Sequence, residues 1–492
     1  MRLNPYECPE WPKLAWVARC GVGDPSVSVH HGPCVEVAEE WCAEAVWAGT
    51  FERGDFDRTD VVFGSGVRCR DGQVHFVSSG STCDRLWYVC RDSEAYVSNS
   101  LPALLATSET SLELDYGGYR ADIYTIIGGL ENLTRQIPGT PSEVRVQYFD
   151  NLVFDGRTVS ESPKPDRSGP FDSYESYFHF LMSSAEELGR NSAAGGRSKP
   201  VVPITSISRG YDSPTAAVLA RQAGCEMAVT FSRSRSLRGH DDSGKSIAQV
   251  LGMPCTEYDR SQMGFESEVF DWAAQGYLQA INLFAFDYPG PVSLFFTGFH
   301  GDKIWDRTAF DSSRSLVRGD STGLGFCEYR LAQGILHCPV PFLGARRAAE
   351  IHAVSASDAM DPWSVGGDYD RPICRRILEE LGVPREAFGM HKNATAVTDS
   401  LPWPRTAECK DSFRDYLRAH DVSLPWELPL RLAYSFDLNV LERVRAAFGI
   451  PFGYNTQYQP RGTSLLFHWA NDTLKNRYAR ALPPRMDPRD RS

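Results

Sequence analysis

VVPITSISRGYDSPTAAVLARQAGCEMAVTFS, residues 201–232, contains the pattern from which the architecture of the C-terminal part follows. The apolar runs at residues 201–207 and 227–232 suit strands that are buried on both faces. Between them TAAVLARQA favours a helix, for which Ser213 is a suitable N-cap and Gly224 a suitable stop. Strand, helix and strand at this spacing predict a doubly wound α/β domain with a parallel sheet.

The same alternation continues beyond this stretch. SIAQVLG ends a second helix at Gly252, and VSLFFTGF at residues 292–299 is a further strand candidate. RPICRRILEELG and LLFHWANDTLKNRYARAL, later in the chain, have helical spacing of their apolar residues. We therefore predict an α/β domain with a helical C-terminal part over residues 170–492.

The first 160 or so residues show a different sequence pattern, with short strand-like runs separated by turn signals. Turns at Asp71-Gly72 and Asp92 each join two such runs. SPKPDRSG at residues 162–169 is rich in proline, serine and charge and marks a boundary. We predict a separate α+β domain over residues 1–165, built from antiparallel sheets with helices.

Composition and charge exclude several classes of function. The 492 residues carry a net charge of −12, so the overall field repels nucleic-acid phosphates. No run approaches the roughly 18 apolar residues that a membrane helix needs, and the first residues show no signal-peptide pattern. The 13 cysteines contain no CxxC pair. We expect a soluble cytoplasmic protein with no nucleic-acid or membrane partner, for which a homodimer is one compatible assembly.

The loop SISRGYDSPTAA, which follows the first strand, concentrates groups that bind anions. Ser208, Gly210, Asp212 and Ser213 lie where a helix N-terminus collects backbone N–H groups and its dipole favours negative charge, as in pyrophosphate sites. Asp212 would repel phosphate unless a cation intervened, so we predict that it binds Mg²⁺ with a second carboxylate. The alternative is an ordinary strand-to-helix turn that Ser213 caps.

Several motifs resemble those of the asparagine synthetase family, which includes β-lactam synthetases and lasso-peptide cyclases. S-R-G-Y-D-S at residues 208–213 resembles the family's S-G-G-x-D-S pyrophosphate loop. FFTGFHGDKIWD at residues 295–306 is similar to its second motif and matches Asp302 to the aspartate that binds Mg²⁺. VPFLG at residues 340–344 resembles its P-F-L-D segment, and FGMHKNA resembles the region of its catalytic lysine, here Lys392.

The N-terminal part carries a resemblance to the same family. STCDRLWYVCRDSEAYVSNSLPALLA at residues 81–106 looks like part of the family's glutaminase domain, which implies an Ntn-hydrolase-like fold. A glutaminase of this type uses a cysteine directly after the initiator methionine, but that residue here is Arg2. Cys8, the nearest cysteine, would have to become a new N-terminus. We expect a degenerate glutaminase-like domain that does not hydrolyse glutamine.

The resemblance implies an adenine nucleotide α-hydrolase-like fold for residues 170–492 and an AMP-forming ligase that uses ATP and Mg²⁺. A substrate carboxylate, on a small molecule or a peptide, would be adenylated and then transferred to an amine donor with release of AMP. Asp212 and Asp302 would bind Mg²⁺, and Lys392 would act in catalysis. The residues expected to contact the nucleotide are Ser206, Ser208, Arg209, Gly210, Tyr211, Asp212, Ser213, Ser232 and Gly298.

Departures from the family pattern make substrate transfer from the family unsafe. Arg209 replaces a glycine of the loop, and Phe299, His300 and Lys303 replace residues of the second motif. Arg209 and Lys303 would add phosphate contacts or be surface charges. Downstream, Arg371, Arg375, Arg376 and Arg385 are not expected to be catalytic, and Arg375 and Arg376 have the spacing of helix-surface ion pairs with Glu379 and Glu380.

Three alternatives stay open. A sulfur-transfer enzyme would keep the adenylation and use a persulfide on Cys225, Cys255 or Cys338. A non-catalytic descendant would bind a nucleotide or a partner without turnover. GHDDSGKS at residues 239–246 also satisfies the Walker pattern, with Lys245 as its lysine, although it follows a polar linker and places two aspartates in the phosphate cradle.

Overall fold

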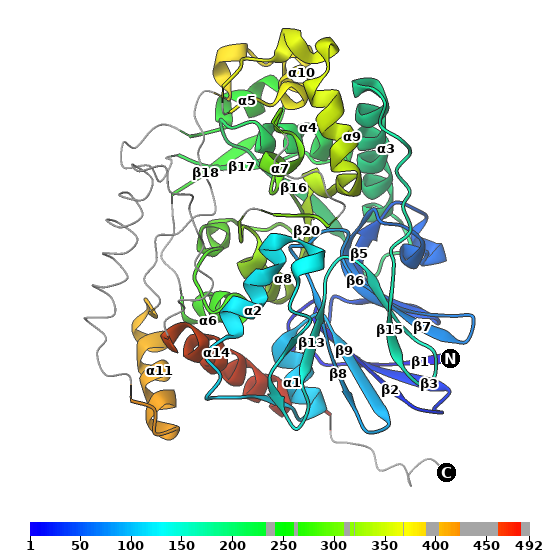
Figure 1. Ribbon diagram of the computed structural model, residues 1–492, viewed down its shortest axis with the longest axis vertical. Helices are drawn as coiled ribbons and strands as arrows, with labels where there is room; N and C mark the ends of the chain where they lie inside the picture. The colour runs from blue at the N-terminus through cyan, green and yellow to red at the C-terminus, as the bar shows by residue number, and fades with distance from the viewer. Residues whose placement is uncertain are drawn as a thin grey trace.

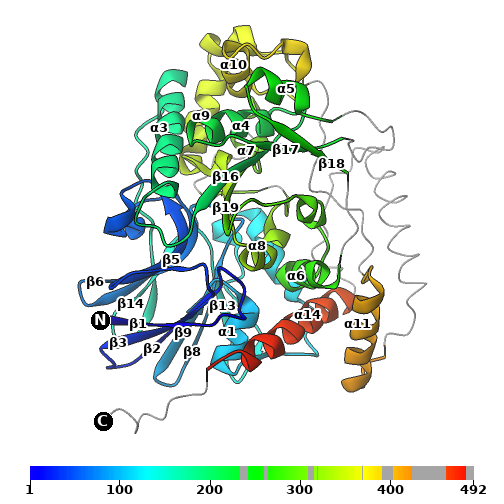
Figure 2. The ribbon, with the colours of Figure 1, turned by 180° about the vertical axis from the view of Figure 1, so that it is seen from behind.

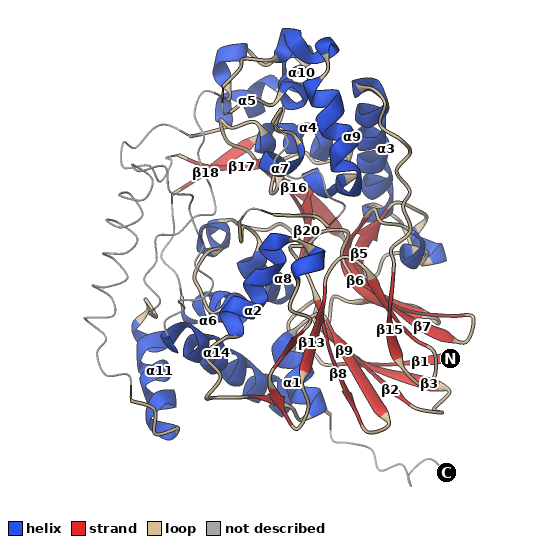
Figure 3. Ribbon diagram, viewed as in Figure 1, coloured by secondary structure: helices blue, strands red, loops and turns tan. Residues whose placement is uncertain are grey.

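The computed structural model of the chain describes residues 1–232, 242–259, 264–308, 315–318, 320–367, 369–389, 403–423 and 461–483. The N-terminal part contains two large sheets that consist mainly of antiparallel pairs and one two-stranded sheet, and a later part contains a parallel sheet (Figure 3). The fold is therefore mixed α/β, with the order of sheet types that the sequence predicts.

The two N-terminal sheets pack face to face (Figure 1). One has seven strands in the order β1-β3-β2-β9-β8-β13-β11, and the other has six in the order β15-β14-β7-β6-β5-β4. Trp16 and Val29 of the first sheet meet Val67 and Phe76 of the second, and all four are 0% exposed. The strands of the first sheet are β1 (Arg2–Glu7), β2 (Trp16–Gly21), β3 (Ser26–His31), β8 (Leu86–Arg91), β9 (Glu94–Ser98), β11 (Gln136–Ile137) and β13 (Val144–Gln147). Those of the second are β4 (Glu36–Val37), β5 (Trp41–Trp47), β6 (Val62–Arg70), β7 (Gln73–Val77), β14 (Asn151–Phe154) and β15 (Val159–Ser162).

Turn chemistry sets the register of the predicted hairpins. Asp71 and Gly72, between β6 and β7, have φ values of 51° and 75°, which suit the two-residue turns that twist with a hairpin. Asp92, between β8 and β9, has a φ of 53°. Both hairpins that the sequence predicts are confirmed.

Helices from distant parts of the chain cover the seven-stranded sheet (Figure 2). α1 (Leu101–Ser108) contacts β9 and also α14 (Arg461–Arg480), which in turn contacts α6 (Phe265–Gln275). The C-terminal helix therefore packs against the N-terminal part of the molecule. Nearby lie α2 (Tyr119–Tyr124), α11 (Ala407–Ala419) and the short strands β10 (Ser111–Leu112) and β12 (Gly139–Thr140). In the part of the chain that the structure describes, no helix combines the length and the apolar character needed to cross a bilayer.

The parallel sheet has five strands in the order β18-β17-β16-β19-β20, and every neighbouring pair is parallel. Its strands are β16 (Val201–Ser206), β17 (Ala228–Phe231), β18 (Cys255–Tyr258), β19 (Val292–Thr297) and β20 (Ile335–Pro339). The three predicted strands are confirmed to within two residues at each end, because apolar runs of this kind form strands that are buried on both faces.

Helices cover both faces of the parallel sheet. Leu294 and Phe296 of β19 belong to the core that contains α3, α4, α9 and α10, whereas Phe295 belongs to the core that contains α6. This alternation follows from the two-residue period of a strand. The helices of this part are α3 (Tyr174–Ser192), α4 (Asp212–Gln222), α5 (Lys245–Val250), α7 (Gly301–Ile304), α8 (Cys327–Gln333), α9 (Ala348–Ala356) and α10 (Pro372–Glu380).

A buried ion network joins the N-terminal sheets to α8. Arg330 of α8 is 1% exposed and forms ion pairs with Glu44 of β5, at 2.8 Å, and with Asp84. Ser65 Oγ and Asn99 Nδ2 also donate hydrogen bonds to Glu44. Because every partner is buried, this network fixes how α8 and the following strand β20 sit on the N-terminal sheets.

Candidate functional site

The predicted anion loop lies at the carboxyl edge of the parallel sheet, between β16 and α4. The Ser208 N–H donates to Ser213 Oγ at 2.9 Å, and the Gly210 N–H donates to Ser208 Oγ at 3.3 Å. The Ser208 and Ser213 hydroxyls are 2.8 Å apart. The loop is thus closed by its own serines, and a phosphate would have to replace these bonds.

The helix start differs from the prediction. α4 begins at Asp212, its N-cap residue is Tyr211, and no side chain caps it. The prediction of Ser213 as N-cap was wrong, because its hydroxyl bonds back to Ser208 inside the loop. Asp212 consequently lies in the first turn, where the helix dipole favours a carboxylate.

The second predicted motif packs directly against Asp212. A Cβ added to Gly298, the residue after β19, would lie 2.4 Å from the backbone carbonyl carbon of Asp212. A Cβ on Gly301 would lie 2.4 Å from Cγ of Asp212. Between them His300 has a φ of 78°, which turns the chain into α7. A side chain at position 298 or 301 would overlap Asp212, and Asp302, the next residue, lies in the first turn of α7.

A buried arginine connects the two motifs. Arg371, the N-cap residue of α10, forms an ion pair with Asp212, and its side chain is 2% exposed whereas that of Asp212 is 25% exposed. Its Nε lies 3.9 Å from Oδ2 of Asp306, which follows α7. Burial lowers the pKa of the Arg371 guanidinium, but Asp212 and Tyr369 together raise it, so that the net shift is upward.

Sequence reasoning missed this arrangement. The sequence assigns no catalytic role to Arg371 and gives no signal for Asp306. The contact joins residues that are far apart in the chain, so no local spacing indicates it. The pairs Arg375–Glu379, at 3.1 Å, and Arg376–Glu380, at 2.8 Å, exist as predicted, but the Arg375 side chain is 2% exposed and not on the surface.

Arg209, a departure from the family loop, contacts protein. Its Nε donates to the carbonyl of Ala387 at 3.3 Å, and its own carbonyl accepts from the Gly389 N–H at 2.8 Å. Gly389 has a φ of 69°, and a Cβ there would lie 2.3 Å from Cζ of Tyr211. Segment 385–389 is therefore held against the loop.

The side chain of Tyr211 anchors the loop in the protein interior. Its ring is 0% exposed and packs against Tyr369 and Phe388, with centroids 4.8 Å and 5.8 Å away. Arg375 Nη2 donates to Tyr211 Oη at 2.5 Å, and burial raises the pKa of the phenol. The ring of Tyr211 is therefore packed into the protein.

Lys392 lies outside the described residues.

Two other predicted contacts lie around the loop. Ser206 is the last residue of β16, and Ser232 follows β17 and donates to Asp259 Oδ1 at 3.0 Å. Both are half-buried at the carboxyl edge of the sheet. Lys303 lies in α7 beside Asp302.

The Walker-like segment borders the same loop. Ser243 forms an isolated antiparallel bridge with Ser208, and a Cβ on Gly244 would lie 2.7 Å from the carbonyl carbon of Ile207. The Gly244 N–H donates to Thr230 Oγ1 at 3.0 Å, and Lys245 begins α5 with an exposed side chain. Of this segment, residues 239–241 lie outside the described residues. The described part packs against the anion loop instead of leaving a strand directly.

The cysteines considered for sulfur transfer are poorly placed. Cys225 precedes β17 and Cys255 begins β18, so both lie at the amino edge of the sheet, opposite the loop. Cys338 lies within β20 and is 0% exposed, and burial raises its pKa well above the usual value. In the N-terminal part, Cys8 is 1% exposed and burial raises its pKa to about 11. Burial disfavours the reactive thiolate at Cys8 and Cys338.

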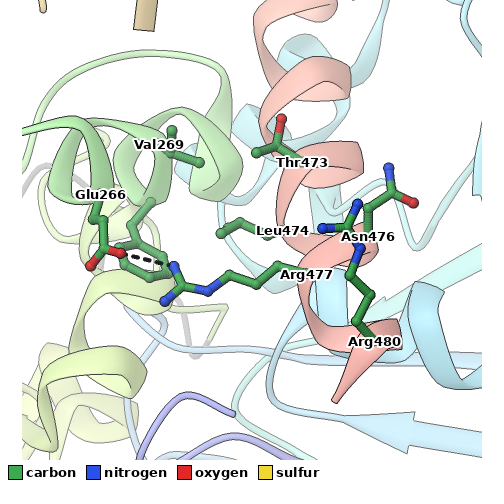
Figure 4. A pocket seen from close by; sticks show the side chains of 8 residues that line it. Glu266, Val269, Thr473, Leu474, Asn476, Arg477 and Arg480 are labelled. Carbon is green, nitrogen blue, oxygen red and sulfur yellow. Dashed lines mark hydrogen bonds and ion pairs between the residues drawn. The ribbon is translucent and has the colours of Figure 1, made fainter. Parts of the chain in front are cut away.

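Described residues line the following two cavities, among others. One of about 580 Å³ lies beside the Arg371 contact and is lined by Arg307, Thr308, Ala356, Asp361, Ser364, Gly366, Gly367 and Asp370. The other, of about 400 Å³, lies between α6 and α14, where Glu266 and Arg477 form an ion pair at 3.1 Å (Figure 4). Over the described ranges, no three His, Cys, Asp or Glu side chains are grouped as metal ligands.

Comparison with protein-family models finds no match to this sequence. Comparison with curated proteins likewise finds no match.

Proposed function

We propose that the chain is an ATP-dependent amide ligase or cyclase that forms AMP and pyrophosphate. A substrate carboxylate attacks the α-phosphorus of ATP and expels pyrophosphate, and an amine then attacks the acyl-adenylate and releases AMP. The observation that supports this proposal is the direct packing of the turn at residues 298–301 on Asp212, because it brings the two motifs together at the carboxyl edge of a parallel sheet.

The loop and the start of α4 would receive the pyrophosphate part of ATP. Ser208 and Ser213 present two hydroxyls 2.8 Å apart at the start of an eleven-residue helix. Hydroxyl donors and a helix N-terminus stabilise phosphate oxygens. Arg209 and Tyr211 would hold the loop in shape through Ala387 and Phe388 instead of touching the nucleotide.

The residues present fit a divalent cation. Asp212 and Asp302 offer carboxylate oxygens, the ligands that Mg²⁺ prefers, and glycines at positions 298 and 301 leave no side chain over Asp212. The guanidinium of Arg371 already stands at Asp212 as a cation. When bound, Mg²⁺ would offset the negative charge that develops on the pyrophosphate leaving group.

The amine would be taken free and not generated from glutamine. Cys8, which directly follows the first strand, is buried and so offers no exposed thiol there. The N-terminal part then serves as a scaffold that positions α8 and β20 through the Arg330 network.

Calorimetric titration with a non-hydrolysable ATP analogue and Mg²⁺ tests the nucleotide site. We expect Asp212→Asn to weaken binding by at least about tenfold, a typical loss for a charged contact, and Lys245→Ala to change it little. Loss in the Lys245 variant alone would support the Walker alternative instead. Circular dichroism of both variants checks that the fold is retained.

Exchange of labelled pyrophosphate into ATP tests the chemistry. Exchange that depends on an added carboxylic acid, with a stable product only when an amine is present, supports amide formation. Exchange without any amide product from a panel of amines would favour sulfur transfer, in which the adenylation is kept and sulfur is the nucleophile. Tight nucleotide binding with no exchange for any acid in a broad panel would indicate a non-catalytic descendant.

A further inference from the structure

A guanidinium occupies the place between the two motifs where a cation is expected. Arg371 pairs with Asp212 of the loop, and its Nε approaches Asp306, four residues beyond Asp302, at 3.9 Å. We infer that Arg371 is an internal counter-ion, which holds Asp212 when no divalent cation is bound and competes with that cation for the carboxylate. This inference rests on the proposed function, since it assigns the Mg²⁺ site to the same carboxylate.

The charges around Arg371 leave room for an exchange of partners. Asp212 and Asp306 carry two negative charges against the one positive charge of Arg371. A carboxylate in this partly buried setting needs a partner, because an unpaired buried charge is costly. Arg371 supplies that partner for Asp212 at the loop.

Asp306 provides a second position for the guanidinium. Arg371 Nε has no hydrogen-bond partner among the described residues, and 3.9 Å is too long for a hydrogen bond. Closing this distance to about 2.9 Å would form one. Arg371 can therefore pair with Asp306 when a cation binds Asp212.

The surroundings keep the guanidinium in place during such an exchange. Its Cζ lies 5.1 Å from the ring centroid of Tyr369, within the range of a cation–π contact. Asp306 is itself fixed, because its Oδ1 accepts from the N–H and the hydroxyl of Thr308 at 3.0 Å and 2.8 Å. A small rotation of Arg371, without rearrangement of α10, is sufficient.

This arrangement lowers the apparent affinity of the nucleotide-free protein for divalent cations, since each binding event must displace Arg371. Removing the guanidinium should therefore tighten cation binding. Removing Asp306 should weaken it, because Arg371 then loses its alternative partner and stays on Asp212.

Titration with Mn²⁺, followed by electron paramagnetic resonance of the free ion, measures this competition on the full-length protein without nucleotide. We expect Arg371→Gln to lower the Mn²⁺ dissociation constant roughly tenfold, within the usual range of coupling between sites. Arg371→Lys should lie near wild type, and Asp306→Asn should raise the constant. Arg376→Gln is the matched control, because Arg376 lies on the same helix and pairs with Glu380 and Glu175 instead of the loop.

A folded Arg371→Gln protein with unchanged or weaker Mn²⁺ affinity would overturn the inference, and so would unchanged affinity in Asp306→Asn. Asp212→Asn in the Arg371→Gln background should abolish the gain, which assigns the site to Asp212. If no variant binds Mn²⁺ while pyrophosphate exchange persists, the counter-ion role fails and the proposed function stands. If Mn²⁺ binds as expected but no nucleotide binds, the proposed function fails and the counter-ion role stands.

Discussion

Arg330 and Arg371 each lie between two carboxylates, and their surroundings differ. Arg330 donates to Glu44 through Nη1 at 2.8 Å and Nη2 at 3.3 Å, and through Nε to Asp84. Arg371 forms one close ion pair, with Asp212, and its Nε lies 3.9 Å from Oδ2 of Asp306. The guanidinium of Arg330 therefore contacts both of its carboxylates closely, whereas that of Arg371 contacts only Asp212 closely.

Solvent exposure follows the same division. The Glu44 and Asp84 side chains are 0% and 4% exposed, but that of Asp212 is 25% exposed. Glu44 also accepts from Ser65 and Asn99, so its lone pairs are used inside the protein. A buried network whose guanidinium donates to both carboxylates fixes structure, whereas a partly exposed pair with a second carboxylate nearby can exchange partners.

The largest expected effect breaks the sealed network. Arg330→Met leaves Glu44 and Asp84 buried without a counter-charge, so we expect a loss of about 3–5 kcal/mol in the free energy of unfolding. Arg371→Gln should cost less than half as much, because Asp212 is partly exposed. Urea unfolding followed by circular dichroism measures both, and equal losses would contradict the comparison.

The next effect concerns the glycines that pack on Asp212. Gly298→Ala or Gly301→Ala places a methyl group 2.4 Å from atoms of Asp212. Overpacking of this kind lowers the free energy of unfolding by about 1–3 kcal/mol. Binding of the ATP analogue and of Mn²⁺ should fall in the same variants. Gly195→Ala is the control, since a Cβ there meets nothing within 4 Å. A Gly301 variant with full Mn²⁺ affinity would argue against the site.

The sequence predicts the parallel strands and the loop, because these depend on local patterns. Apolar runs and a glycine-containing turn identify β16 and β17 with the helix between them. Contacts between distant segments could not be predicted in this way. Arg371 meets Asp212, and Arg375 is buried rather than exposed, because α10 packs on α4. The prediction that Ser213 caps α4 was wrong, because a capping serine and a serine that bonds within the loop have the same sequence pattern.

The stability of the region around Arg330 should depend on pH through a second buried side chain of α8. Glu328, also on α8, is 2% exposed, and burial raises its pKa from 4.5 to about 7 although Ser100 and Leu101 donate hydrogen bonds to it. The folded protein keeps this proton where the unfolded chain releases it. Stability should therefore fall as the pH rises from about 4.5 to about 7, by no more than about 1.4 kcal/mol per pH unit.

Glu328→Gln should remove that slope, because the amide retains the acceptor oxygen and does not ionise. Unfolding in urea at several pH values between 4.5 and 7 measures the difference from wild type. Glu186→Gln, at a side chain that is 55% exposed, should leave the slope unchanged. An identical pH profile in wild type and Glu328→Gln would show that this carboxyl does not titrate in the window.

The smallest effect decides between two roles for Arg209. If Arg209 holds segment 385–389, Arg209→Ala removes its hydrogen bond to Ala387 and lowers the free energy of unfolding by about 1 kcal/mol. Affinity for the ATP analogue should then fall by less than about tenfold, because a neutral contact is weaker than a charge-assisted one. If Arg209 binds phosphate instead, the affinity falls further and its salt dependence decreases, while stability is unchanged. Calorimetric titration at two salt concentrations, together with urea unfolding, distinguishes the two, and Arg376→Gln again serves as the control because it removes an arginine that does not touch the loop.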